Sequence, residues 1–150
     1  MKLIIGNDHA GPGLKEEIKE YLSEKGHEVI DFGVAEGEKI DYPLMGEKVG
    51  DAIVAGEADL GILICGTGIG ISIAANKVPG VIAAVVSDPT SAGLAREHNG
   101  ANIIAFGARI VGPEVAKDIV DAFISAEPLG DRHERRRAIF GEIEARHQKG

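Results

Sequence analysis

A lone cysteine followed by three alternating glycines is the segment of this chain with the clearest chemical potential. Residues 65–70 read Cys-Gly-Thr-Gly-Ile-Gly and follow an apolar run over residues 60–65, which predicts that Cys65 ends a buried strand. Glycines let backbone N–H groups approach a ligand closely, and the free N–H groups of a following helix favour negative charge. A thiolate at Cys65 beside these donors would be a base with an oxyanion site. The alternative is an inert thiol in the core.

The same glycines match part of a dinucleotide-binding fingerprint. Gly66 and Gly68 fit the first two glycines of G-x-G-x-x-G, but Ile71 occupies the third position. Asp88 follows about 20 residues later, where a ribose-binding acid is expected. A nucleotide-binding module therefore stays open as an interpretation, although a chain of 150 residues leaves no second domain to hold a hydride acceptor.

Histidine and aspartate side chains at two further places could transfer protons or bind a sugar. His98 lies near the end of the fourth predicted helix and shares a face with Leu94 and Ala95, so we expect it to point inward. An imidazole that titrates near neutral pH suits proton transfer to a sugar oxygen, whereas the alternative is a histidine that only caps helix carbonyls. Asp8 and His9 follow the first predicted strand and could bind hydroxyls, or Asp8 could cap the next helix.

Four arginines gather near the start of the last predicted helix, in a chain whose net charge is −8. Successive residues of a helix are about 100° apart, so Arg132 and Arg136 align with the apolar stripe of this helix, whereas Arg135 and Arg137 project away from it. The stripe consists of Ile139, Phe140 and Ile143. Guanidiniums that face protein need anions, and bidentate phosphate binding is their natural use; the alternative is pairing with acidic residues of this chain. Arg109, just after the fifth predicted strand, is a third candidate for binding phosphate.

Composition and charge narrow the class of protein. The chain has 150 residues, 44% apolar residues and one cysteine, which fits a single domain over residues 1–150 without an intrachain disulfide. Its net charge of −8 argues against nucleic acid or a membrane surface as a partner. The histidines and the cysteine show no metal-site spacing, and there is neither a signal peptide nor an apolar run of about 18 residues. We therefore expect a cytoplasmic protein without a bound metal.

Apolar runs alternate with amphipathic stretches along the whole chain. The expected strands cover residues 2–5, 28–32, 60–65, 81–86 and 102–106. Helices are expected between them and after the last one, where they cover residues 113–126 and about 131–148. This alternation predicts an α/β fold, a three-layer sandwich in which a five-stranded parallel sheet carries helices on both faces. Ligands of such folds bind at the carboxyl ends of the strands, after which Asp8, Cys65 and Arg109 lie.

Residues 62–77 resemble the signature segment of the B-type ribose-5-phosphate isomerases, a family that includes the galactose-6-phosphate isomerase subunits. The resemblance covers essentially the whole chain, through the segments Asp8-His9-Ala10-Gly11, Asp41-Tyr42-Pro43, Arg96-Glu97-His98-Asn99, Gly107-Ala108-Arg109 and Arg132-His133. It implies a Rossmann-type sandwich that works without a metal or an organic cofactor. It also implies active sites between two subunits, in a homodimer or a tetramer of dimers. The helix over about 131–148 is then the candidate to reach a neighbouring subunit.

The resemblance also implies a reaction, in which ribose 5-phosphate and ribulose 5-phosphate interconvert through an enediolate. Cys65 is the implied base with Thr67 beside it, and His98 is the implied ring-opening acid, aided by Asp8. The implied sugar contacts are Asp8, His9, Gly66, Thr67, Gly68, Ile69, Gly70 and Asn99. The implied phosphate contacts are Arg109, Arg132 and Arg136. The alternatives are an isomerase of a six-carbon sugar phosphate, such as allose or galactose 6-phosphate, and a non-catalytic module that binds a nucleotide or a sugar phosphate.

Two positions depart from the family pattern. Gly100 stands where a polar residue usually follows His-Asn, and Thr90 stands where an aromatic residue is common after the fourth strand. Both are expected to border the sugar site. They therefore bear on the preferred sugar more than on the class of reaction.

Overall fold

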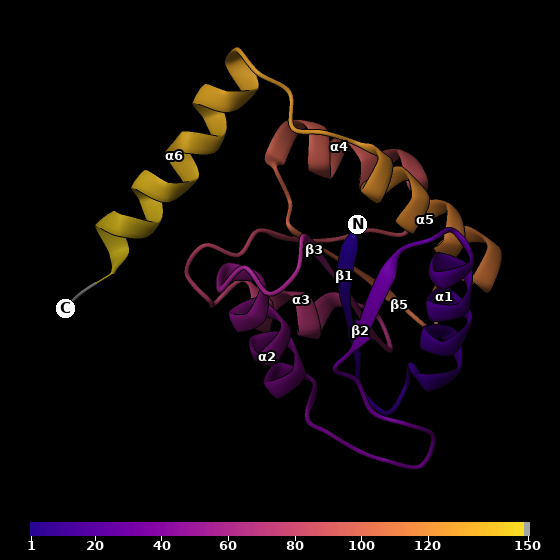
Figure 1. The fold of residues 1–150 in the computed structure, drawn as a ribbon. Coiled ribbons are helices and arrows are strands. Elements are labelled where there is room, and N and C mark those ends of the chain that lie inside the picture. Colours follow the sequence, from indigo (N-terminus) through magenta and orange to yellow (C-terminus); the bar gives the residue numbers. More distant parts are fainter. Residues whose placement is uncertain (149–150) are drawn as a thin grey trace.

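The computed structural model describes residues 1–148, which form one parallel sheet with helices around it (Figure 1). The strands are β1 (Lys2–Asn7), β2 (Glu28–Asp31), β3 (Leu60–Cys65), β4 (Ala83–Val85) and β5 (Ile103–Gly107). Their order in the sheet is β2-β1-β3-β5-β4, and every neighbouring pair is parallel. The five-stranded parallel sheet is therefore confirmed. The fourth strand is shorter than the expected 81–86, because only Ala83–Val85 pair with β5.

Six helices follow the expected pattern within the described residues. They are α1 (Pro12–Glu24), α2 (Tyr42–Val54), α3 (Ile69–Ala75), α4 (Pro89–Asn99), α5 (Pro113–Ser125) and α6 (Arg132–His147). Four of them have proline in one of the first two positions, where its fixed φ suits a helix and its missing N–H has no partner to lose. No helix within residues 1–148 has the length and apolar character needed to cross a membrane.

Helices cover both faces of the sheet and make the two outer layers of the sandwich. Alternate side chains of a strand point to opposite faces, so Leu3 and Ile5 of β1 join a cluster with Phe123 of α5, and Ile4 joins another with Met45 of α2. Helices α1, α4 and α5 contribute to the first cluster, and α2 and α3 to the second. The predicted α/β sandwich of Rossmann type is confirmed.

Helix α6 extends away from the three layers (Figure 1). None of its residues is buried. Its apolar stripe is exposed to solvent, with Ile139 at 37%, Phe140 at 43% and Ile143 at 43% of full exposure. Toward the body of the protein, Glu144 Oε1 accepts a hydrogen bond from the N–H of Gly80 at 3.2 Å. The chain therefore leaves an apolar surface on this helix that its own layers do not cover.

Candidate active site

The carboxyl ends of β1, β3 and β5 meet at one edge of the sheet. Asn7 pairs with Ile64, and Cys65 pairs with Gly107, so the segments that leave these three strands start side by side. The N–H of Asp8 still donates to the carbonyl of Ile64, at 3.2 Å. A cavity of about 530 Å³ opens at this edge. The predicted site residues that line it are Asp8, His9, Cys65, Gly66, Thr67, Ile69, Gly70 and Arg109.

Cys65 lies in the cavity wall with a hydrogen-bond donor beside its sulfur. The side chain is 4% exposed, and the N–H of Gly68 donates to its Sγ at 3.1 Å. Thr67 is next to it in the loop, and its Oγ1 accepts the N–H of Ile69 at 3.1 Å. The loop after β3 thus places a backbone N–H donor directly beside the sulfur. Cys65 is therefore buried and at the same time lines a cavity that a ligand could enter.

Close packing against β5 fixes the loop that carries this donor. Gly68 has φ +81°, in the left-handed region, and a Cβ at this position would lie 2.7 Å from the backbone of Phe106. On the other side of the contact, a Cβ on Gly107 would lie 2.6 Å from the carbonyl oxygen of Gly66. At position 68 only glycine allows both the conformation and the approach, which explains the middle glycine of the loop.

Asp8 shapes the turn before α1 rather than capping the helix. Its Oδ1 accepts the N–H of Ala10 at 2.9 Å, whereas the residue at the N-cap of α1 is Gly11, which makes no side-chain capping bond. The capping alternative for Asp8 is therefore wrong. Both Asp8 and His9 line the cavity. Asp8 is only 4% exposed, whereas His9 is exposed to solvent.

A buried amide that the sequence analysis did not identify ties this turn to the loop after β2. Asn7 is fully buried, and its Nδ2 donates to the carbonyls of Asp8 at 2.8 Å and Val34 at 3.1 Å. Its Oδ1 accepts the N–H of Val34 at 3.1 Å. The buried Lys15 also donates to the carbonyl of Val34, at 2.8 Å, and pairs with Asp31 at 3.1 Å. The sequence signal that could have identified Asn7 is that a polar residue ends an otherwise apolar strand.

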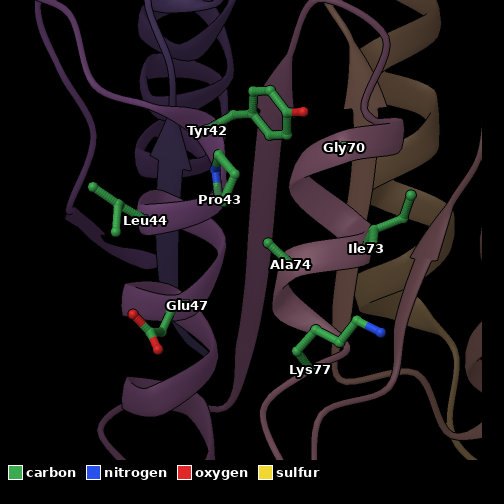
Figure 2. Close-up of a pocket in the computed structure, with 8 residues that line it drawn as sticks. All are labelled: Tyr42, Pro43, Leu44, Glu47, Gly70, Ile73, Ala74 and Lys77. Carbon is green, nitrogen blue, oxygen red and sulfur yellow. The ribbon is translucent and has the colours of Figure 1, made fainter.

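A second hollow, of about 380 Å³, adjoins the cavity between α2 and α3 (Figure 2). Tyr42, Gly70 and Ile73 line both. Figure 2 shows the Tyr42 ring reaching from the start of α2 toward Gly70 at the start of α3, and a Cβ on Gly70 would collide with that ring. Exposed apolar side chains form its surface, with Tyr42 at 44%, Leu44 at 56% and Ile73 at 55% exposure. Tyr42 is a site residue to which the sequence analysis gave no role.

His98 lies at the opposite edge of the sheet from Cys65. The last turn of α4 carries His98 and leads into β5 at Ile103, whose partner on β3 is Gly61. Cys65, by contrast, pairs with Gly107 at the other end of β5. Four residues of strand separate these two levels, which is about 13 Å at 3.3 Å per residue. One copy of the chain therefore does not bring the predicted acid and the predicted base together.

The imidazole of His98 packs against α6. It stacks on His133, with ring centroids 4.3 Å apart and an angle of 2° between the planes. On the same face of α4, Ala95 is buried at 7% exposure, Leu94 is 40% exposed, and His98 itself is half-buried. The predicted inward orientation is therefore realised only in part, because the imidazole faces α6 and not the sheet. Arg137 donates a hydrogen bond to the carbonyl of His98. An arginine side chain, and not the imidazole, therefore bonds the carbonyl at the end of α4. Asn99 is exposed next to it.

The arginines of α6 are oriented differently from the prediction. Arg132 and Arg136 are exposed, and Arg137, which was expected to project away, is half-buried. Among residues 1–148, Arg132 and Arg136 form no ion pair with a carboxylate, so the alternative of intrachain pairing is not realised there. Desolvation lowers the pKa of His133, and the charges of His98, Arg132, Arg136 and Arg137 lower it further. The start of α6 is thus a positively charged surface that attracts anions.

The predicted site residues, together with His133, form two groups. The cysteine half is the 530 Å³ cavity around Cys65, and the histidine half is the surface of α4 and α6 that carries His98, Asn99, Arg132, His133 and Arg136. Gly100 faces α6, and Thr90 is exposed at the start of α4 and does not line the cavity, so neither borders the cysteine half of the same chain. Across residues 1–148 the histidines, carboxylates and cysteine form no group that could hold a metal ion.

Comparison with known proteins gives the family. A family model described as Ribose/Galactose Isomerase matches residues 3–139. The chain is 52% identical over 145 residues to ribose-5-phosphate isomerase B of Escherichia coli, covering 97% of each chain. It is 46% identical over 127 residues to galactose-6-phosphate isomerase subunit LacB of Clostridium acetobutylicum, covering 85% of this chain and 73% of that one. The solved structure of Clostridium thermocellum ribose-5-phosphate isomerase B matches with a TM-score of 0.95 and 53% identity, over 99% of this chain and 100% of that one.

The chain therefore belongs to the ribose/galactose isomerase family, in the group of the type B ribose-5-phosphate isomerases, and it is a sugar-phosphate isomerase. The expectation that the sequence motifs raised about its family is confirmed.

Proposed function

We propose that this isomerase interconverts ribose 5-phosphate and ribulose 5-phosphate, with Cys65 as the base. The observation that carries the proposal is the hydrogen bond from Gly68 to Cys65 Sγ, 3.1 Å long, in the wall of a cavity that Asp8 and Arg109 also line. A thiolate at this place has a stabilising donor on one side and room for a ligand on the other. The names of the Escherichia coli and Clostridium thermocellum relatives support the choice of a five-carbon sugar.

The first step in this proposal opens the sugar ring. Ribose 5-phosphate closes into a furanose, and a proton must reach the ring oxygen while the anomeric hydroxyl loses its own. His98 delivers the proton to the ring oxygen, because an imidazole changes charge near neutral pH. Asp8, buried at the bottom of the cysteine half, assists by holding the anomeric hydroxyl.

The second step moves a proton between two carbons. The Cys65 thiolate removes the proton from C2 of the open aldose, and the electron pair of that C–H bond forms the enediolate. The hydroxyl of Thr67 and the loop N–H groups of residues 66–70, other than those of Gly68 and Ile69, hold its oxygens. The resulting thiol returns the proton to C1, and a proton passes from the oxygen on C2 to the oxygen on C1. The carbonyl thereby moves from C1 to C2, and no external oxidant or reductant is needed.

The complete site requires a second copy of the chain. In one copy His98 and Cys65 lie at opposite edges of the sheet, so we propose that the histidine half of one copy faces the cysteine half of another. A twofold axis would then create two equal sites in a homodimer, which could pair further into a tetramer. Two exposed apolar surfaces support the proposal: the stripe of Ile139, Phe140 and Ile143 on α6, and the hollow between α2 and α3 in Figure 2.

The phosphate would lie where cationic groups of both halves meet. Arg109 lines the cavity of the cysteine half, and a Cβ on Gly66 would be 3.2 Å from its Nη1, so the guanidinium lies over the loop next to Cys65. Arg132 and Arg136 of the second copy would add two exposed guanidiniums one helical turn apart. Planar guanidiniums form paired hydrogen bonds with phosphate oxygens. Within residues 1–148 no carboxylate pairs with Arg132 or Arg136, which leaves both guanidiniums available for this anion.

A six-carbon sugar phosphate, such as allose or galactose 6-phosphate, is the second candidate substrate. The 46% identity to galactose-6-phosphate isomerase subunit LacB favours it. A longer sugar would need the same base and the same phosphate clamp, by which we mean Arg109, Arg132 and Arg136. The distance between the base and the clamp would have to be greater. The two candidates therefore differ in the fit between the halves and not in chemistry.

Turnover of a panel of sugar phosphates tests the proposal. We expect the highest kcat/KM with ribose 5-phosphate, measured by formation of ribulose 5-phosphate, and a much lower value with allose 6-phosphate or galactose 6-phosphate. The reverse order would replace the pentose with the hexose. A rise in melting temperature with NAD but not with ribose 5-phosphate, together with no turnover of any sugar, would instead indicate a nucleotide-binding module.

A further inference from the structure

Arg137 joins α6 to the end of α4 through three backbone carbonyls. Its Nη1 donates to the carbonyls of Glu97 at 3.4 Å and His98 at 3.3 Å, and its Nη2 donates to the carbonyl of Leu129 at 2.7 Å. The last carbonyls of a helix have no partner within the helix, and a cation there also meets the negative end of the helix dipole. Leu129 is itself tied to the same turn, because its N–H donates to the carbonyl of Glu97 at 2.9 Å.

Gly100 leaves the space through which this arginine passes. It ends α4 with φ +65°, in the left-handed region, and a Cβ at this position would lie 2.7 Å from Cδ of Arg137. Any other residue at position 100 would have to push the arginine stem aside. The glycine that departs from the family pattern therefore meets α6 of its own chain, and the two residues act as one structural unit.

The contact of Arg137 with α4 fixes the orientation of the α6 residues that belong to the histidine half. His133 is four residues before Arg137, so the two share a face of the helix, and that face lies on α4, where His133 stacks on His98 at 4.3 Å. Arg132 and Arg136 form a second pair four residues apart, rotated by about 100° and exposed. Holding Arg137 against α4 thus fixes both the imidazole stack and the direction of the two free guanidiniums.

We propose that Arg137, seated over Gly100, is a positioning residue that holds His133 against His98 and directs Arg132 and Arg136 toward the substrate phosphate. The proposal rests on the proposed function of the histidine half. Arg137 touches no substrate in this arrangement. It affects the reaction by fixing the positions of His98, Arg132 and Arg136, which do contact the substrate. We call the contact of Arg137 with the end of α4 the latch.

Three variants separate this role from a general effect of charge. Arg137→Ala should raise KM for ribose 5-phosphate about tenfold or more and lower kcat, because the phosphate clamp and the ring-opening acid lose their common support. Arg135→Ala removes the same charge from an exposed position of the same helix and should change either constant less than twofold. Arg137→Lys keeps the charge but cannot fork to three carbonyls, so it should fall between them. Equal effects of Arg137→Ala and Arg135→Ala would overturn the proposal.

Gly100→Asn tests the pairing with the glycine. Asparagine tolerates the left-handed conformation, so the variant chiefly adds a side chain where Arg137 passes. We expect it to reproduce the rise in KM when Arg137 is present and to add little in an Arg137→Ala background, where the obstruction is gone. Full additivity of the two changes would show that the residues act separately, against the proposal.

A measurement that does not depend on activity keeps the latch distinct from the proposed function. Amide hydrogen exchange over residues 132–137, followed by mass spectrometry, should become about tenfold faster in Arg137→Ala than in Arg135→Ala, because the first turns of α6 lose their hold on α4. Unchanged exchange would overturn the latch even in an active enzyme. Faster exchange in a protein that turns over no sugar phosphate would instead leave the latch standing and reject the proposed function.

Discussion

Cys65 and His98 occupy opposite edges of the same parallel sheet. The cysteine pairs with Gly107 at the carboxyl end of β5, and the histidine lies in the last turn of α4, which leads into the amino end of that strand. The separation follows from the topology, because a helix that connects parallel strands runs antiparallel to them and ends at the amino edge. Within one copy of the chain the proposed base and the proposed acid therefore lie at opposite edges of the sheet, which is why we propose a site between two copies.

Mixed dimers test that arrangement. Cys65→Ala and His98→Ala should each be nearly inactive, and a dimer with one chain of each kind should keep one site in which both residues are native. Random assembly of equal amounts puts half of the chains in such dimers, so activity should recover to about a quarter of the wild-type value. Co-expression with two different affinity tags and purification through both would isolate the mixed dimer. Recovery near zero in that purified species would argue that each site is built from one chain.

Changing Arg136→Ala should weaken binding of the phosphate. Loss of a hydrogen bond to a charged group costs about 1.5–3 kcal/mol, which corresponds to a rise of about ten- to a hundredfold in KM for ribose 5-phosphate. The slow reaction of unphosphorylated ribose should barely change, since it makes no such contact. Steady-state kinetics with both sugars measure the difference. An equal loss with both would assign Arg136 a structural role instead.

Helix α6 shows where the sequence was insufficient. The helical spacing of Ile139, Phe140 and Ile143 in the sequence predicts a face turned toward protein. In the structure this stripe is exposed, because α6 extends away from the three layers (Figure 1). Apolar residues at helical spacing identify a helix face that packs against other apolar residues. The spacing does not say whether those residues belong to the same chain or to another copy. The prediction that Arg132 and Arg136 face protein depends on that unknown.

The cysteine half, in contrast, followed from local patterns. The apolar run of β3 and the glycines after it predicted both a buried strand end and a close approach of backbone, and the contact of Gly68 with Phe106 provides it. Parallel strands bring their carboxyl ends together, so Asp8 and Arg109 could be placed near Cys65 without knowing the strand order. The stack of His98 on His133 could not be predicted, because it depends on how two helices 30 or more residues apart along the chain pack together.

The stacked histidines predict how stability depends on pH. The pKa of His133 is lowered from its ordinary value of 6.5, first by desolvation and then by the nearby positive charges. The unfolded chain therefore binds a proton more readily than the folded one when the pH falls through 6.5. Stability is retained above that value, falls as the pH drops below it, and levels off below the lowered pKa of the folded state.

His133→Phe should reduce this loss, because phenylalanine can stack but does not titrate. The difference in urea midpoint between about pH 7.5 and about pH 5.5 should be smaller in His133→Phe than in the wild type. His147→Phe is the matched control, since His147 is exposed near the end of α6. If both variants show the wild-type difference, the His133 site contributes nothing to acid sensitivity.

Cys65→Ser tests whether the thiolate is the base. The serine hydroxyl is close in size to the thiol and can still accept the Gly68 N–H, but it stays protonated at neutral pH. We expect kcat to fall on the order of a hundredfold or more, as for loss of a general base, with an unchanged melting temperature and KM within a few fold. Exchange of the C2 proton of ribose 5-phosphate with deuterated solvent, followed by NMR, should slow by the same factor, because that step needs the base directly.

Alkylation gives an independent measure on the unmodified chain. Cys65 is the only cysteine, so an iodoacetamide label should inactivate the enzyme at one group per chain, and mass spectrometry can count it. Ribose 5-phosphate should protect the thiol by filling the 530 Å³ cavity, whereas unphosphorylated ribose should protect poorly because it lacks the arginine contacts. Complete labelling with full retention of turnover would rule out the thiolate. Suspicion would then shift to a carboxylate such as that of Asp8, which lines the same cavity and is 4% exposed.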